Sequence, residues 1–143
     1  MRIFKAFIRN VPVLQNSMLP TIHHGDRIIS ISSVLVTLKR GDVVVFNYDQ
    51  ETMSIKRIVG LPGEHVSISQ GQVLINGAAL KEEGVNRDTS DLEPMIIPRG
   101  SYFVLGDNRP VSKDSRVFGP VKMNDIRFRA LAVYRPIKNL KLL

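Results

Sequence analysis

Residues 54–64 read Ser-Ile-Lys-Arg-Ile-Val-Gly-Leu-Pro-Gly-Glu. The first six of these residues are rich in β-branched side chains, which favours a short strand. The Gly-Leu-Pro-Gly run that follows is typical of a turn, because proline fixes one backbone angle and glycine tolerates unusual ones. A short strand that ends in a turn predicts an antiparallel sheet.

The same pattern recurs along the chain. Six other short segments are rich in valine, isoleucine and aromatic residues and are separated by glycine, proline or Asn-Gly: 27–31, 42–46, 65–69, 72–75, 102–105 and 127–134. Hairpin turns are predicted at Gln70-Gly71 and Asn76-Gly77, where positive φ angles are tolerated. The sequence therefore predicts a mainly β fold, an antiparallel barrel or sandwich with few short helices.

Composition excludes several kinds of chemistry. The chain has 143 residues, 43% of them hydrophobic, which suits one core and a single domain over residues 11–143. It contains no cysteine, so disulfides, thiolate metal sites and a cysteine nucleophile are excluded. The net charge of +7 favours an anionic partner, either nucleic acid or acidic lipid.

Two segments fall outside the strand pattern. Residues 1–10 place apolar side chains at helical spacing with basic residues between them, which predicts a short amphipathic helix on a membrane surface or a frayed end. No stretch approaches the roughly 20 apolar residues of a membrane-spanning helix. Residues 81–98 carry scattered acids, a glycine and a proline, and we expect a surface loop excursion there.

Ser17 and Lys56 are the candidate reactive pair. A serine hydroxyl needs a base to remove its proton, and a lysine acts as that base only when its amine is neutral. A free lysine has a pKa of about 10.4, so burial among apolar neighbours must lower it. Ile55 and Ile58 flank Lys56 in an apolar strand, whereas Arg57 is expected on the opposite face.

Two further blocks give this pair its context. In the first, Pro20 restricts the chain just after Ser17, and Gly25-Asp26 turns it towards the next strand. In the second, residues 106–119 form a polar run after an apolar strand, as expected for a loop that supports a site.

The chain resembles type I signal peptidases, membrane serine peptidases with a Ser/Lys dyad, over about residues 7–135 and with the three blocks in the family's order. The resemblance implies that Ser17 is the acylating nucleophile and that Lys56 is the general base, which later activates the deacylating water. It also implies preprotein signal peptides as substrates, no cofactor or metal, and a bacterial plasma membrane location with the catalytic domain on the extracytoplasmic face.

The resemblance also assigns supporting roles in residues 106–116. Ser112 is expected to hydrogen-bond and orient the lysine amine. Asp114 and Arg116 are expected to form an ion pair that braces the loop. The residues expected to shape the loop without reacting are Asp107, Asn108 and Arg109.

Substrate contacts are likewise implied by the resemblance. The backbone N–H of Ser17 is expected in the oxyanion hole, and Gln15 stands where many members place a second donor. Small pockets that accept alanine in an Ala-X-Ala sequence map to Val13, Ile22 and Ile55. The substrate is expected to bind as an added strand along residues 11–15 and 53–55.

The sequence departs from the family in its anchor, because members usually carry transmembrane helices before the serine block and only residues 1–10 stand there. Either the chain is a trimmed catalytic fragment, with these residues a remnant of the anchor, or this member relies on another attachment. Two other functions remain open: a self-cleaving repressor-type Ser/Lys peptidase, whose class lacks the Gly-Asp-Asn-Arg loop, and an inactive relative that assembles surface proteins.

The remaining polar features have simpler interpretations. His23 and His24 are expected to be solvated turn residues rather than metal ligands. The basic C-terminal stretch lacks aromatic interleaving and nucleic-acid-binding motifs, so an anionic membrane surface or plain solvated charge is favoured over nucleic acid. The sequence does not define an oligomeric state.

Overall fold

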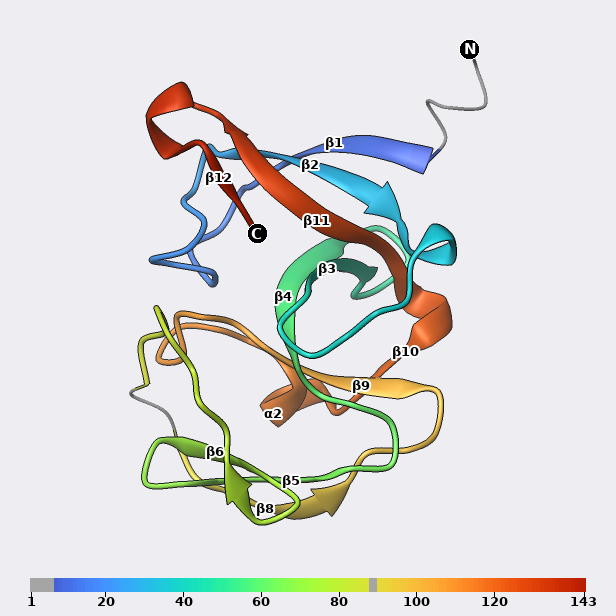
Figure 1. The fold of residues 1–143 in the computed structure, drawn as a ribbon, viewed down its shortest axis with the longest axis vertical. Helices are drawn as coiled ribbons and strands as arrows, with labels where there is room; N and C mark the ends of the chain where they lie inside the picture. The colour runs from blue at the N-terminus through green and yellow to red at the C-terminus, as the bar shows by residue number, and fades with distance from the viewer. Residues whose placement is uncertain (1–6, 88–89) are drawn as a thin grey trace.

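The computed structural model describes residues 7–87 and 90–143, which form two antiparallel sheets (Figure 1). The strands of the eight-stranded sheet are, in spatial order, β1 (Ile8–Pro12), β2 (Arg27–Ser32), β11 (Ile126–Arg135), β3 (Val43–Asn47), β4 (Met53–Gly60), β9 (Ser101–Leu105) and β10 (Val121–Lys122), with β12 (Lys141–Leu142) paired to β11. The four-stranded sheet consists of β7 (Ala78–Ala79), β6 (Gln72–Ile75), β5 (His65–Ser69) and β8 (Leu92–Ile96). Helical turns are short: η1 (Ser33–Leu35), α2 (Ser115–Phe118), η2 (Met123–Asp125) and η3 (Ile137–Asn139).

This architecture confirms the predicted mainly β fold with few helices. All seven predicted strands are present, and their ends differ from the predicted ends by at most one residue. Both predicted hairpin turns have positive φ angles, 50° and 77° at Gln70-Gly71 and 52° and 80° at Asn76-Gly77.

The prediction of a loop over the whole of residues 81–98 is wrong for Leu92–Ile96, which form β8. This strand lies at the edge of the smaller sheet and pairs with β5, with a register shift between Val66 and Ile68. Pro94 is tolerated there because an edge strand needs hydrogen bonds on one side only, and a register shift removes one of those. Proline in the sequence therefore concealed a strand.

The prediction of a helix at the N-terminus is wrong for residues 8–10. They belong to β1, which pairs antiparallel with β2 and places Ile8 opposite Ile31. Partnering with a neighbouring strand overrides a helical pattern of so few residues. Residues 1–6 lie outside the described part of the chain. In the described residues, no helix has the length and apolarity needed to cross a membrane.

The core lies in three clusters, and one of them fixes the segment that carries Ser17. This cluster packs Met18 and Ile22, which follow the serine, against side chains of β2, β3 and β11. Met18 is 1% exposed and Ile22 is fully buried. Burial of two large apolar side chains is worth on the order of 4 kcal/mol, which anchors an otherwise irregular segment. Another cluster joins the two sheets through Val59 and Phe103.

Candidate active site

Ser17 and Lys56, 39 positions apart in sequence, lie in direct contact. The Lys56 amine is 2.9 Å from the Ser17 hydroxyl oxygen. Lys56 projects from β4 and is only 2% exposed, whereas Ser17 lies in the connection between β1 and β2 and is half-buried. A nucleophile within hydrogen-bond reach of its base is the arrangement needed for nucleophilic catalysis.

The backbone of the serine segment is held from two directions. Ile22 N–H donates to the Met18 carbonyl at 2.9 Å, which closes a turn just after the serine. From the other side, Asn108 N–H donates to the Ser17 carbonyl at 3.0 Å, and the Asn108 side-chain amide donates to the Asn16 carbonyl at 3.1 Å. The loop after β9 therefore fixes the serine through its main chain.

Among the described residues, the Lys56 amine has two other close partners besides Ser17. It lies 3.1 Å from the Ser54 hydroxyl oxygen and 3.0 Å from the Ile55 carbonyl oxygen. Burial lowers the pKa of Lys56 to about 8, while the negative charge of Asp114 opposes that fall. A group with this pKa is neutral in roughly a tenth of molecules at pH 7, compared with fewer than one in about a thousand for a free lysine.

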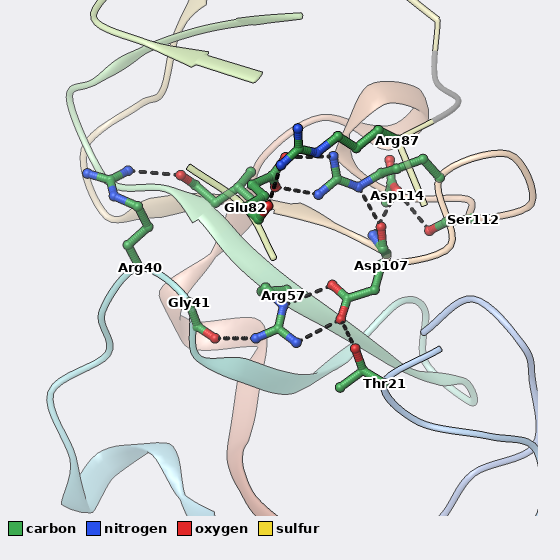
Figure 2. Close-up of polar contacts among 12 residues, drawn as sticks. Thr21, Arg40, Gly41, Arg57, Glu82, Arg87, Asp107, Ser112 and Asp114 are labelled. Carbon is green, nitrogen blue, oxygen red and sulfur yellow. Dashed lines mark hydrogen bonds and ion pairs between the residues drawn. The ribbon is translucent and has the colours of Figure 1, made fainter. Parts of the chain in front are cut away.

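The predicted hydrogen bond between Ser112 and Lys56 is not among the contacts of the described residues. The Ser112 hydroxyl instead donates to Asp114 Oδ2 at 2.7 Å, as Figure 2 shows. A carboxylate is the stronger acceptor for a hydroxyl, since hydrogen bonds to charged groups are shorter and stronger. Ser112 therefore influences the amine through Asp114, whose charge acts on it.

The predicted ion pair between Asp114 and Arg116 is present. Arg116 Nε lies 2.8 Å from Asp114 Oδ1. The same guanidinium donates to the Arg109 and Ser112 carbonyls at 2.9 and 3.2 Å. Asp114 also accepts from Gly106 N–H at 3.0 Å, so this pair closes the loop on itself.

A second polar network lies on the other side of β4 (Figure 2). The carboxylate of Asp107 is fully buried and accepts from Arg57 Nε and Nη2 at 2.8 and 2.7 Å and from the Thr21 hydroxyl at 2.5 Å. Arg57 also donates to the Gly41 carbonyl at 2.8 Å. Because strand side chains alternate, Arg57 points away from Lys56, and this network ties β4 to both the loop and the serine segment.

Residue Glu82 connects the 81–98 segment to the same loop. Arg109 is 1% exposed and lies 2.5 Å from a Glu82 carboxylate oxygen. Arg109 also donates to the Gly106 carbonyl at 2.7 Å. Asp107, Asn108 and Arg109 thus hold the loop in shape, as predicted, and the segment predicted as a surface excursion contributes a partner to it.

A cavity of about 390 Å³ opens beside Ser17. Its walls come mainly from residues 11–15 and 51–55, and these include the segments 11–15 and 53–55 that were predicted to bind substrate. Val13, Gln15 and Ile55 line it, and the pocket and oxyanion-hole roles assigned to them stay predictions. Ile22 does not line the cavity and is fully buried in the core, because the turn after Ser17 directs it inward.

The histidine pair lies apart from this cavity. His23 and His24 are exposed, and His23 Nδ1 is 3.7 Å from Asp26 Oδ2. Asp26 is itself buried and accepts from the Asn139 side chain at 2.7 Å.

Sequence reasoning did not single out Ser54, Thr21 or Glu82. For Ser54 a signal was present, because a residue two positions before Lys56 on a strand lies on the same face. The contacts of Thr21 and Glu82 span 86 and 27 positions and depend on the tertiary fold.

Residues 1–135 match the family of signal peptidases, peptidase S26. The chain is 39% identical to a signal peptidase I of Leptolyngbya laminosa, with 97% of this chain and 73% of the relative covered. It is 38% identical to the probable signal peptidase I-2 of Synechocystis sp. (strain ATCC 27184 / PCC 6803 / Kazusa), with 99% and 69% covered.

A solved structure agrees with these relatives. The crystal structure of a signal peptidase I from Enterococcus faecalis V583 is similar with a TM-score of 0.56 and 34% sequence identity, covering 64% of this chain and 94% of that one. Together with the family match over most of the chain, this shows that the chain belongs to the signal peptidase family, peptidase S26, and is a serine endopeptidase.

Proposed function

We propose that this protein removes N-terminal signal peptides from exported preproteins, with Ser17 as nucleophile and Lys56 as general base. The observation that carries the proposal is the 2.9 Å contact between the Ser17 hydroxyl and a lysine amine that is 2% exposed. The family relationship supports the substrate class. Substitution of either residue tests the proposal.

The reaction proceeds through an acyl-enzyme. The neutral Lys56 amine takes the Ser17 proton as the hydroxyl oxygen bonds to the scissile carbonyl carbon. The resulting ammonium protonates the leaving amine as the peptide bond breaks. Lys56 then takes a proton from water, the hydroxide bonds to the acyl carbon, and Ser17 regains a proton as the signal peptide leaves.

The negative charge that develops on the carbonyl oxygen needs hydrogen-bond donors. We assign one to the backbone N–H of Ser17 and place the second at Gln15, whose side chain is exposed on the cavity wall. Loss of one such donor typically lowers kcat by about 100-fold or more.

The rate of cleavage should rise with pH through an apparent pKa of about 8, because the reaction requires the neutral form of Lys56 and burial sets the pKa of that group. The measurement is kcat/KM for a fluorogenic signal-sequence peptide between pH 6 and 10. A rise in rate centred near the pKa of a free lysine, about 10.4, would contradict a desolvated base.

Two strand edges are available to bind an extended substrate. Among the described strands, β1 ends the larger sheet and pairs with β2 alone, and the chain continues from it along the cavity through residues 13–15. β4 pairs with β3 along Met53–Arg57, but its pairing with β9 begins only at Arg57. The outer edge at Met53–Ile55 therefore faces the cavity, where backbone pairing gives affinity and side-chain pockets give selectivity.

A peptide with Ala-X-Ala before the cut should be cleaved, whereas one with Phe in place of the last Ala should react at least about 100-fold more slowly. Val13 and Ile55 narrow the pocket, and branched walls exclude a large ring sterically. The ratio of kcat/KM values, measured by chromatography of the products, gives the discrimination. Equal cleavage of both peptides would refute this pocket assignment.

We also propose that the protein works at the extracytoplasmic face of the bacterial plasma membrane and contacts anionic lipid. The C-terminal patch, defined as residues 135–142, exposes Ile137, Leu140 and Leu142 at 82%, 64% and 87%. Basic side chains alternate with them: Arg135, Lys138 and Lys141. Apolar side chains interleaved with positive charge suit an anionic lipid surface.

The patch lies beside the serine segment, since Asn139 hydrogen-bonds Asp26 at 2.7 Å. Replacing Ile137, Leu140 and Leu142 together by serine should lower flotation with phosphatidylglycerol-containing liposomes at least about 5-fold, because each buried apolar side chain contributes to partitioning. The matched control is serine at Val34 and Leu35, which are exposed on η1. Equal loss in the control, or none in the triple variant, would refute the assignment.

A further inference from the structure

Three oxygen atoms surround the Lys56 amine, and one of them belongs to a side chain with no assigned role. They are Ser17 Oγ at 2.9 Å, Ile55 O at 3.0 Å and Ser54 Oγ at 3.1 Å. An ammonium has three N–H groups, so this set satisfies the charged form completely. Ser54 is half-buried on the same face of β4 as Lys56 and lines the cavity.

Loss of one proton changes the number of N–H donors on the Lys56 amine. The neutral amine keeps two N–H groups and gains one lone pair. The Ile55 carbonyl oxygen can only accept, so it always takes one N–H. If the Ser54 oxygen accepts the other, the lone pair is left facing the Ser17 hydroxyl, which is the direction required for proton transfer.

We propose that Ser54 is a positioning residue of the dyad: its hydroxyl oxygen accepts an N–H of Lys56 and thereby directs the lone pair of the amine to the Ser17 proton. This inference rests on the proposed function of Ser17 and Lys56. After proton transfer, the same oxygen accepts from the ammonium and stabilises the charge formed in a buried site.

The position of Ser112 supports this division of roles. Its hydroxyl donates to Asp114 at 2.7 Å, so the loop serine is engaged with the carboxylate. A hydroxyl from β4 itself contacts the amine instead. Ser54 is two residues from Lys56 on one strand, so the geometry between them is fixed by backbone that pairs with β3.

The test compares Ser54→Thr with Ser54→Val, because these side chains have the same shape and differ in one hydroxyl. Ser54→Thr should keep kcat within about 3-fold of wild type, whereas Ser54→Val should lose about 10-fold to 100-fold in kcat with KM little changed. Ser54→Ala also removes the hydroxyl, without the added methyl groups of valine. Ser67→Ala, on β5 in the other sheet, is the control serine.

A pH profile separates positioning from a merely structural role. Removing an acceptor of the ammonium disfavours the charged form of Lys56. The apparent pKa at which kcat rises with pH should therefore be lower in Ser54→Val than in wild type, and should equal the wild-type value in Ser54→Thr. A kcat equal to that of wild type, with an unchanged apparent pKa, in both Ser54→Val and Ser54→Ala would overturn the proposal.

A second measurement does not depend on turnover. NMR titration of the lysine Cε and Nζ signals follows the protonation of Lys56 directly in the full chain. The Lys56 signal is assigned as the one that is missing from the spectrum of Lys56→Met. If wild type cleaves no preprotein, the proposed function fails, but a Lys56 pKa that falls in Ser54→Val and not in Ser54→Thr still supports the Ser54 contact. An unchanged Lys56 titration in both variants overturns it.

Discussion

Ser17→Ala and Lys56→Met should each lower preprotein cleavage by at least about 1,000-fold, the scale at which loss of a nucleophile or its base reduces a serine peptidase to residual activity. Ser17→Ala removes the atom that bonds to the scissile carbon in the proposed reaction. Lys56→Met keeps a side chain of similar length in the same buried position but removes the proposed proton acceptor. Cleavage is measured by gel mobility of a preprotein and by mass spectrometry of the products.

Both variants should remain folded, which makes the loss interpretable. Lys56 is 2% exposed, and methionine buries without the desolvation cost of an amine. Lys122→Met, at an exposed lysine of β10, is the matched control and should retain wild-type activity. Cleavage surviving in Ser17→Ala or Lys56→Met would end the dyad proposal, and a wild type that cleaves nothing would favour the surface-protein assembly function.

Arg57→Met should destabilise the protein by about 3–5 kcal/mol, the usual cost of leaving a buried charge without its partner. Asp107 is fully buried and takes two hydrogen bonds from Arg57, at 2.7 and 2.8 Å. Without the guanidinium, the carboxylate keeps the Thr21 hydroxyl but, within residues 7–87 and 90–143, no opposite charge at that distance. The free energy of unfolding in urea, followed by circular dichroism, gives the change.

A double variant distinguishes the lost partner from lost packing. Arg57→Met combined with Asp107→Leu removes both charges and should recover at least half of the lost stability, because an apolar pair leaves no charge to desolvate. Arg127→Met, at an exposed arginine of β11, is the control and should change stability by less than about 0.5 kcal/mol. A loss below about 1 kcal/mol in Arg57→Met would show that the network is not structurally important.

The fold was largely predictable because its strands carry local signals. Residues 65–69 and 72–75 form a hairpin whose ends match the prediction, since Gln70-Gly71 encodes the turn directly. β8 was missed because Pro94 argues against a strand unless its edge position is known. β1 was missed because four apolar residues at helical spacing within residues 1–10 cannot outweigh pairing with β2.

The site was predictable to the extent that its residues lie in recognisable blocks. Ser17, Lys56, Asp114 and Arg116 were named, and the structure brings them together. The Ser54 contact follows from two residues on the same face of β4. What could not be predicted, by contrast, is that Ser112 contacts Asp114 and not the amine, because that depends on how the loop closes. Ile22 shows the same limit, since one turn decides whether a residue near Ser17 faces the cavity or the core.

Trapping of the acyl-enzyme tests the central claim, that Lys56 activates Ser17 for attack. A signal-sequence ester substrate is mixed with the enzyme at pH 8, quenched in acid and digested with trypsin. The peptide covering residues 10–27 contains Ser17 as its only serine. The account predicts the acyl mass on Ser17 in wild type and its loss in Lys56→Met; acylation of another residue, or equal acylation of Ser17 in both proteins, would contradict it.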